Sequence, residues 1–123
     1  MKTTQLPVFR KTYDLVSLIY KITNKFPKAY KHNLGEDMKR QSLLLLKRLF
    51  KANRTNNNEF RVKILEDFLD DYDLLKVLIR LMNEEGIVTI KDSSNLVLIT
   101  ENITKQVNGW KNKTEKSEEK IIS

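Results

Sequence analysis

Hydrophobic residues recur along most of this chain at spacings of three and four, the period that places them on one side of an α-helix. The pattern predicts four amphipathic helices, over residues 8–25, 34–54, 59–85 and 90–111. Four such helices joined by short connections favour a single all-α domain, 1–111, folded as an up-down-up-down antiparallel four-helix bundle. Residues 112–123 mix charges with few apolar side chains, and we expect them to form a disordered C-terminal tail.

The second predicted helix, 34–54, carries the most informative pattern. Asn33, with Glu36 three residues later, fits an N-cap, and after Gly35 no further Gly or Pro interrupts the helix before Arg54. Its apolar arc is wider than packing inside one bundle requires, which indicates contacts beyond the bundle. On the opposite side, cations recur at spacings of seven, four and three, at Arg40, Lys47, Lys51 and Arg54, with Lys39 and Arg48 flanking them.

Residues 87–100 allow two interpretations. Their β-branched residues on both sides of a polar KDSS segment are typical of a β-hairpin. Thr89 and Asp92, however, have the spacing of a capping box, and the apolar residues from Leu96 to Trp110 step by three and four. We therefore predict that the fourth helix begins at residue 90.

Charge is distributed unevenly along the chain, whose net charge is +7. Residues 1–58 contain 13 Lys and Arg against 3 Asp and Glu, whereas residues 59–123 contain 10 against 13. Clustered cations favour a nucleic-acid partner, because each phosphate contact releases counterions. The candidate residues for binding nucleic acid or an acidic protein surface are Arg10, Lys11, Lys21, Lys39, Arg40, Lys47, Arg48, Lys51 and Arg54.

The sequence lacks the residues that most catalytic and metal sites need. It has no cysteine and one histidine, His32, which excludes thiolate sites and histidine clusters, and we expect His32 to lie in a solvated loop without a catalytic role. Four aspartates of the third predicted helix fall around much of its circumference, so we expect a solvated acidic surface, or a patch that meets a basic surface elsewhere, and no cation site; they are Asp67, Asp70, Asp71 and Asp73. We predict no catalytic residue, no metal and no cofactor, and a small ribonuclease is disfavoured for want of an acid and a base.

Aromatic and apolar residues limit the choice of partners further. Phe50, Phe60 and most tyrosines lie at core spacing, so a base-stacking surface is not predicted. Tyr30, between Lys28 and Lys31, is the one aromatic residue placed to touch a ligand. No segment approaches the roughly 18 apolar residues that a membrane span requires, and we expect a cytoplasmic protein with no membrane contact.

Several segments closely resemble the accessory variability determinant (Avd) proteins of diversity-generating retroelements. They are LPVFRKTYDLVSLIYKITNKFPKAYKHNLGEDM at 6–38, KAN at 51–53, LLKVLIRL at 74–81 and VNGW at 107–110. The Avd proteins belong to a wider family of four-helix bundles that includes proteins encoded in intervening sequences of bacterial large-subunit ribosomal RNA genes. The resemblance departs at Asn108, where family members usually carry glycine.

The resemblance implies a bundle that assembles into a basic homopentamer and has no catalysis of its own. Such a protein binds the reverse transcriptase of the retroelement and nucleic acid, including template RNA, and supports mutagenic copying and retrohoming. The alternative is a module of the same wider family that forms oligomers and contacts only protein, with no role in a retroelement.

Overall fold

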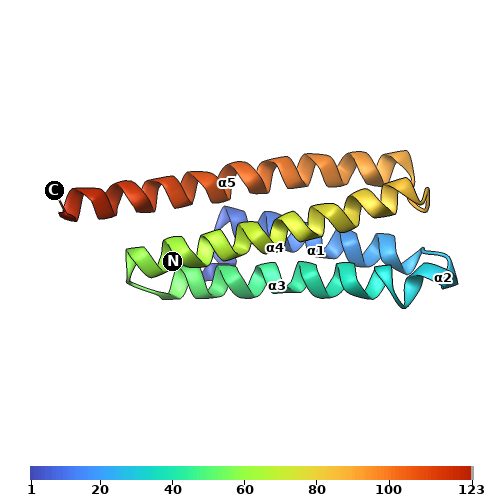
Figure 1. Ribbon diagram of the computed structural model, residues 1–123, viewed down its shortest axis with the longest axis horizontal. Coiled ribbons are helices and arrows are strands. Elements are labelled where there is room, and N and C mark those ends of the chain that lie inside the picture. Colours follow the sequence, from blue (N-terminus) through green and yellow to red (C-terminus); the bar gives the residue numbers. More distant parts are fainter. Residues whose placement is uncertain (123) are drawn as a thin grey trace.

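The computed structural model describes residues 1–122, with the side chains of residues 1–117. Four long helices form an antiparallel bundle, which confirms the predicted fold class (Figure 1). A single-turn helix, α2, lies in the connection between the first two of them, and a short 3-10 helix, η1, precedes them all. The elements are η1 (Thr3–Gln5), α1 (Pro7–Asn24), α2 (Lys28–Lys31), α3 (Leu34–Arg54), α4 (Asn58–Glu84) and α5 (Ile90–Ile122).

Each long helix packs against two others. The sequence neighbours α1 and α3, α3 and α4, and α4 and α5 lie side by side, and α5 returns to pack against α1 (Figure 1). Every helix therefore has a face toward the core, two flanks toward neighbours and an outer face toward solvent. The outer face of α3 carries the cations discussed below.

Local signals in the sequence set where the helices begin and end. Pro7 occupies the first turn of α1, where a missing backbone N–H is tolerated. Asn33 and Asn57 cap the next two long helices: their side chains accept hydrogen bonds from the backbone N–H of Leu34 at 2.6 Å and of Phe60 at 2.9 Å. Gly86 ends α4 with a φ of 67°, a left-handed conformation that favours glycine.

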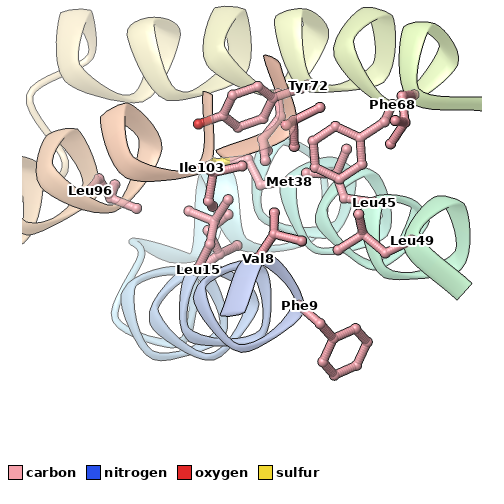
Figure 2. Packing of buried hydrophobic residues seen from close by; sticks show 14 of the residues in the cluster. Val8, Phe9, Leu15, Met38, Leu45, Leu49, Phe68, Tyr72, Leu96 and Ile103 are labelled. Carbon is pink, nitrogen blue, oxygen red and sulfur yellow. The ribbon is translucent and has the colours of Figure 1, made fainter. Parts of the chain in front are cut away.

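A single hydrophobic core runs the length of the bundle. Leu15, Met38, Leu45, Tyr72 and Ile103, drawn from all four long helices, are fully buried and point toward one another (Figure 2). The buried hydroxyl of Tyr72 has a hydrogen-bond partner, because it donates a 2.6 Å hydrogen bond to the backbone carbonyl of Thr100 in α5. Phe9 lies at the rim of this cluster, where α1 and α3 meet (Figure 2).

The C-terminal helix differs from our expectation. We predicted a helix end near residue 111 and disorder from 112, but α5 continues to Ile122, and Ser123 lies outside the described residues. Thr114 is buried against the bundle, with an exposed fraction of 5%. Lys111 reaches Glu115 at 3.6 Å and Glu66 of α4 at 3.9 Å. Charged residues at such spacings stabilise a helix, so a polar composition did not imply disorder here.

The helices of the described residues also bear on membrane contact. None of them combines the length and the apolar character that crossing a bilayer would require.

Candidate nucleic-acid interface

Four cations form a line on the outer face of α3. Because Met38, Leu45 and Leu49 point into the core, the residues half a helical turn away must point outward. Those residues carry the α3 basic stripe, which consists of Arg40, Lys47, Lys51 and Arg54. Lys51 is half-buried and the other three are exposed. The stripe spans about 21 Å at the usual rise of a helix.

The two halves of this stripe differ in their surroundings. Arg40 lies 3.3 Å from Asp37, but both side chains are largely exposed, at 77% and 58%, so the pair contributes little and leaves the guanidinium accessible. Among the described residues, Lys47, Lys51 and Arg54 have no acidic side chain within ion-pair distance. The C-terminal half of the stripe is therefore the more favourable part for an anionic ligand.

Two of the predicted binding residues are instead engaged inside the subunit. Arg48 donates from Nε to Asp71 of α4 at 2.8 Å, and the two side chains are only 26% and 20% exposed. Lys39 lies 3.0 Å from Glu36 and sits over the ring of Tyr20, 5.5 Å from its centre. The hydrogen bond from Lys39 lowers the pKa of the Glu36 carboxyl. Sequence spacing could not reveal the contact of Arg48, since its partner lies on another helix.

The predicted cations of α1 do not extend the stripe. Lys21 lines a surface depression with Asn95 and Leu98 of α5, on the side of α1 that faces away from α3. Lys11 precedes Leu18 by seven residues and therefore lies on the same side of the helix as this residue, which lines the same depression. Arg10 is exposed beside Tyr13, closer to the seam between α1 and α3. The nine candidates thus divide among four surroundings: the α3 basic stripe, ion pairs inside the subunit, the depression between α1 and α5, and the position of Arg10 near the seam.

Several aromatic residues that we predicted to be in the core are exposed. Tyr13 is 58% exposed, Tyr20 42%, Phe50 43% and Phe60 53%. The prediction was wrong because helical spacing identifies a broad apolar arc but not which of its edges a neighbouring helix covers. Tyr30, the aromatic residue that the sequence places where it could touch a ligand, donates a 2.9 Å hydrogen bond to Glu85, and this bond raises the pKa of the tyrosine.

The outer face of α4 offers a different surface. Leu74, Val77 and Leu81 recur there at spacings of three and four and are 50%, 59% and 42% exposed. We call these three residues the α4 apolar strip. Exposed apolar side chains that are contiguous on one face are typical of surfaces that contact another protein.

The acidic residues of α4 do not assemble a metal site. Within the described part of the chain, no three His, Cys, Asp or Glu side chains are grouped so that they could hold a metal ion. Asp71 is committed to Arg48, and Asp73 lies 3.2 Å from Lys76 on the same helix. His32 is exposed at the end of α2.

Comparison with protein families identifies the chain. A family model described as bAvd-like matches residues 7–114, which include almost all of the bundle. The chain belongs to the bAvd-like family. It is accordingly an Avd-like accessory protein, and the predicted resemblance is confirmed. No curated protein sequence matches it.

Some residues of the segments that first indicated the bAvd-like family occupy structural positions in this bundle. Phe26 and Gly35 meet where α1 and α3 are joined, and a Cβ atom added at Gly35 would lie 3.5 Å from the Phe26 ring and 3.4 Å from the carbonyl oxygen of Tyr30. Trp110 is half-buried, with the guanidinium of Arg61 6.0 Å above its ring. These residues hold the helices together, whereas Leu74, Val77 and Leu81 of the LLKVLIRL segment are exposed and form the α4 apolar strip.

Proposed function

We propose that this protein is a non-enzymatic accessory protein of a diversity-generating retroelement. It binds the reverse transcriptase of the element together with template RNA or DNA, and so supports mutagenic reverse transcription and retrohoming. Membership in the bAvd-like family favours the accessory role. The observation that carries the nucleic-acid part of the proposal is the α3 basic stripe, in which Lys47, Lys51 and Arg54 point outward without an acidic partner in the described residues.

The proposed mechanism is scaffolding. One stripe of four cations supplies only a few phosphate contacts, and each contact adds modestly to the binding affinity at physiological salt concentration. In a homo-oligomer, which we propose to be a pentamer, several stripes act on one strand and their contacts add through effective concentration. The protein would thereby hold the template near the polymerase without taking part in the chemistry.

A second candidate function is supported by the α4 apolar strip. In this alternative the protein is a module that forms oligomers and contacts only protein, and its cations meet an acidic protein surface. Leu74, Val77 and Leu81 are the observation in its favour, because exposed apolar residues on one face suit a subunit contact. The strip is compatible with both candidates, since the first also requires an oligomer.

Capture of the reverse transcriptase, with and without ribonuclease, separates the two candidates. We would compare the wild type with a stripe variant, Lys47→Gln/Lys51→Gln/Arg54→Gln, and with a control of equal charge change on α4, Lys63→Gln/Lys76→Gln/Arg80→Gln. In the control, Lys76 and Arg80 already face acids of their own helix. We expect copurifying RNA with the wild type and the control, and much less with the stripe variant. Capture of the enzyme without RNA by all three proteins would favour the protein-only module.

The oligomer is tested on the α4 apolar strip. Val77→Glu places a charge at the most exposed of its three residues, and we expect native mass spectrometry to show a shift from oligomers to monomers. The exposed residue Leu98 of α5 provides the matched control, Leu98→Glu, which should leave the oligomer intact. An unchanged oligomer in Val77→Glu would exclude the strip as a subunit contact.

A further inference from the structure

Exposed aromatic rings line the seam between α1 and α3. Two contacts fix how these antiparallel helices face each other: Phe9 meets Phe50 edge-on at 5.2 Å between ring centres, and Lys39 sits over Tyr20 at 5.5 Å. Tyr13 lies between these two contacts along α1, one turn beyond Phe9 and two turns before Tyr20. Phe50, Tyr13 and Tyr20 therefore follow one another along the line where α1 and α3 meet, and we call these three residues the aromatic seam.

The rings of the aromatic seam are presented to solvent more than core packing requires. The three residues are between 42% and 58% exposed, whereas Phe9, which contacts Phe50, is only 8% exposed. Neither tyrosine hydroxyl forms a hydrogen bond with another described residue. The bundle thus buries one edge of each ring and leaves a face or edge free.

Cations surround the aromatic seam. Arg10 lies one turn before Tyr13 and lines the same surface depression, Lys47 lies one turn before Phe50 on α3, and Lys39 is in contact with Tyr20. Acidic side chains lie near two of these cations: Asp14 lines the depression with Arg10, and Glu36 pairs with Lys39. The charge is therefore mixed near Arg10 and near Lys39, and positive at Lys47. Rings flanked by cations suit a ligand that has both flat apolar groups and negative charge.

We infer that the aromatic seam binds unpaired bases of single-stranded nucleic acid, which stack on Tyr13 and Tyr20 while Arg10 and Lys47 contact phosphates. Single strands are the form in which bases are free to stack on side chains, and such stacking tolerates any sequence because every base has a flat face. This inference rests on the proposed function and deepens it, since it names the single-stranded form as the ligand and adds rings to a surface otherwise defined by charge.

The test compares two single strands that differ only in their bases. The probes are an oligothymidylate of about 20 nucleotides and an abasic strand of equal length and charge, a length sufficient for several contacts. We expect the wild type to bind the thymidylate more tightly than the abasic strand. Tyr13→Leu/Tyr20→Leu keeps apolar bulk but removes the rings, and we expect it to lower thymidylate affinity about tenfold or more and to leave abasic affinity unchanged.

Two matched variants complete the design. Tyr13→Phe/Tyr20→Phe retains the rings and should keep wild-type affinity for thymidylate. Phe60→Leu removes an equally exposed ring on α4, away from the seam, and should change neither affinity. Circular dichroism of each variant confirms that the helices form.

The outcomes distinguish this inference from the proposed function. Equal affinity of the wild type for both strands, or an equal decrease in both affinities in the leucine variant, would overturn the inference and leave the phosphate-binding role in place. Dissociation of the oligomer by the leucine variant would also overturn it, because the rings would then belong to a subunit contact. Failure of the wild type to bind either strand or RNA would remove the nucleic-acid part of the proposed function itself.

Discussion

Lys47 and Arg48 are neighbours in the sequence but have different surroundings. Lys47 is exposed on the α3 basic stripe, whereas Arg48 is tied to Asp71 of α4 at 2.8 Å. Burial and pairing thus separate a cation that is free to bind an anion from one that joins two helices. The sequence pattern assigned both the same basic character, because the position of α4 relative to α3 is not encoded in the spacing within α3.

Alanine at these two positions should change different properties: stability at Arg48 and RNA affinity at Lys47. Arg48→Ala removes the ion pair and is expected to lower the free energy of unfolding by about 1 kcal/mol, with little effect on RNA affinity. Lys47→Ala should leave stability almost unchanged and weaken RNA binding. Urea unfolding and fluorescence anisotropy with a labelled RNA measure the two quantities. A decrease in RNA affinity in a folded Arg48→Ala protein would contradict this assignment.

Tyr72 should make stability depend on pH at the alkaline end. Burial raises the pKa of its phenol from about 10 in an unfolded chain to about 12 in the bundle. Between these values the unfolded state loses the proton while the folded state keeps it, so stability is present in full below pH 10 and declines as pH rises toward 12.

Chemical unfolding of the wild type and of Tyr72→Phe isolates this effect. Tyr72→Phe lacks the hydrogen bond to Thr100 and should be less stable by about 1 kcal/mol near neutral pH. Because it has no phenol to ionise there, the stability difference should shift in its favour by about 2 kcal/mol between about pH 10 and pH 12, which removes and then reverses its disadvantage. A constant difference between the two proteins over that range would show that the phenol of Tyr72 does not titrate as described.

At the scale of helices, the bounds of α3 and the start of α5 follow from the sequence. The Asn33 cap, an uninterrupted helical pattern and the Thr89–Asp92 signal define them, and the backbone N–H of Asp92 donates a 3.1 Å hydrogen bond to the Thr89 hydroxyl. The extension of α5 beyond residue 111 could not be predicted from composition, since it depends on the contact of Lys111 with Glu66 of α4 and on the burial of Thr114.

Two glycines, one at the end of α4 and one inside α5, provide a matched prediction. Gly86 has a φ of 67° with open space around its Cα, so Gly86→Ala should cost about 1 kcal/mol of stability from backbone strain alone. Gly109 lies inside α5, also with open space, and Gly109→Ala should raise stability by about 0.5–1 kcal/mol. Thermal and urea unfolding measure both. A destabilised Gly109→Ala monomer would contradict the open helical surroundings of this residue.

At the scale of the whole molecule, the fold class and the location of positive charge follow from the sequence, but the division of the surface does not. The first half of the chain places its cations on α1 and α3, yet Lys11 and Lys21 of α1 lie toward α5, while the α3 basic stripe forms a separate line. The aromatic seam and the α4 apolar strip arise from how the four helices are placed side by side. The aromatic seam combines residues of two helices, and the α4 apolar strip is exposed because no other helix of the bundle covers it. Periodicity within one helix does not show which of its flanks a neighbouring helix covers, so neither surface could be recognised from it.

The salt dependence of RNA affinity tests the central claim, that the α3 basic stripe contacts phosphates, most directly. For the wild type, we expect the logarithm of the association constant to fall steeply and linearly with the logarithm of salt concentration. Lys47→Gln/Lys51→Gln/Arg54→Gln should reduce that slope by about 2, at roughly 0.7 for each single-strand phosphate that the variant no longer neutralises, while the Lys63→Gln/Lys76→Gln/Arg80→Gln control keeps the wild-type slope. A flat response of the wild type, or the same slope for all three proteins, would contradict the account.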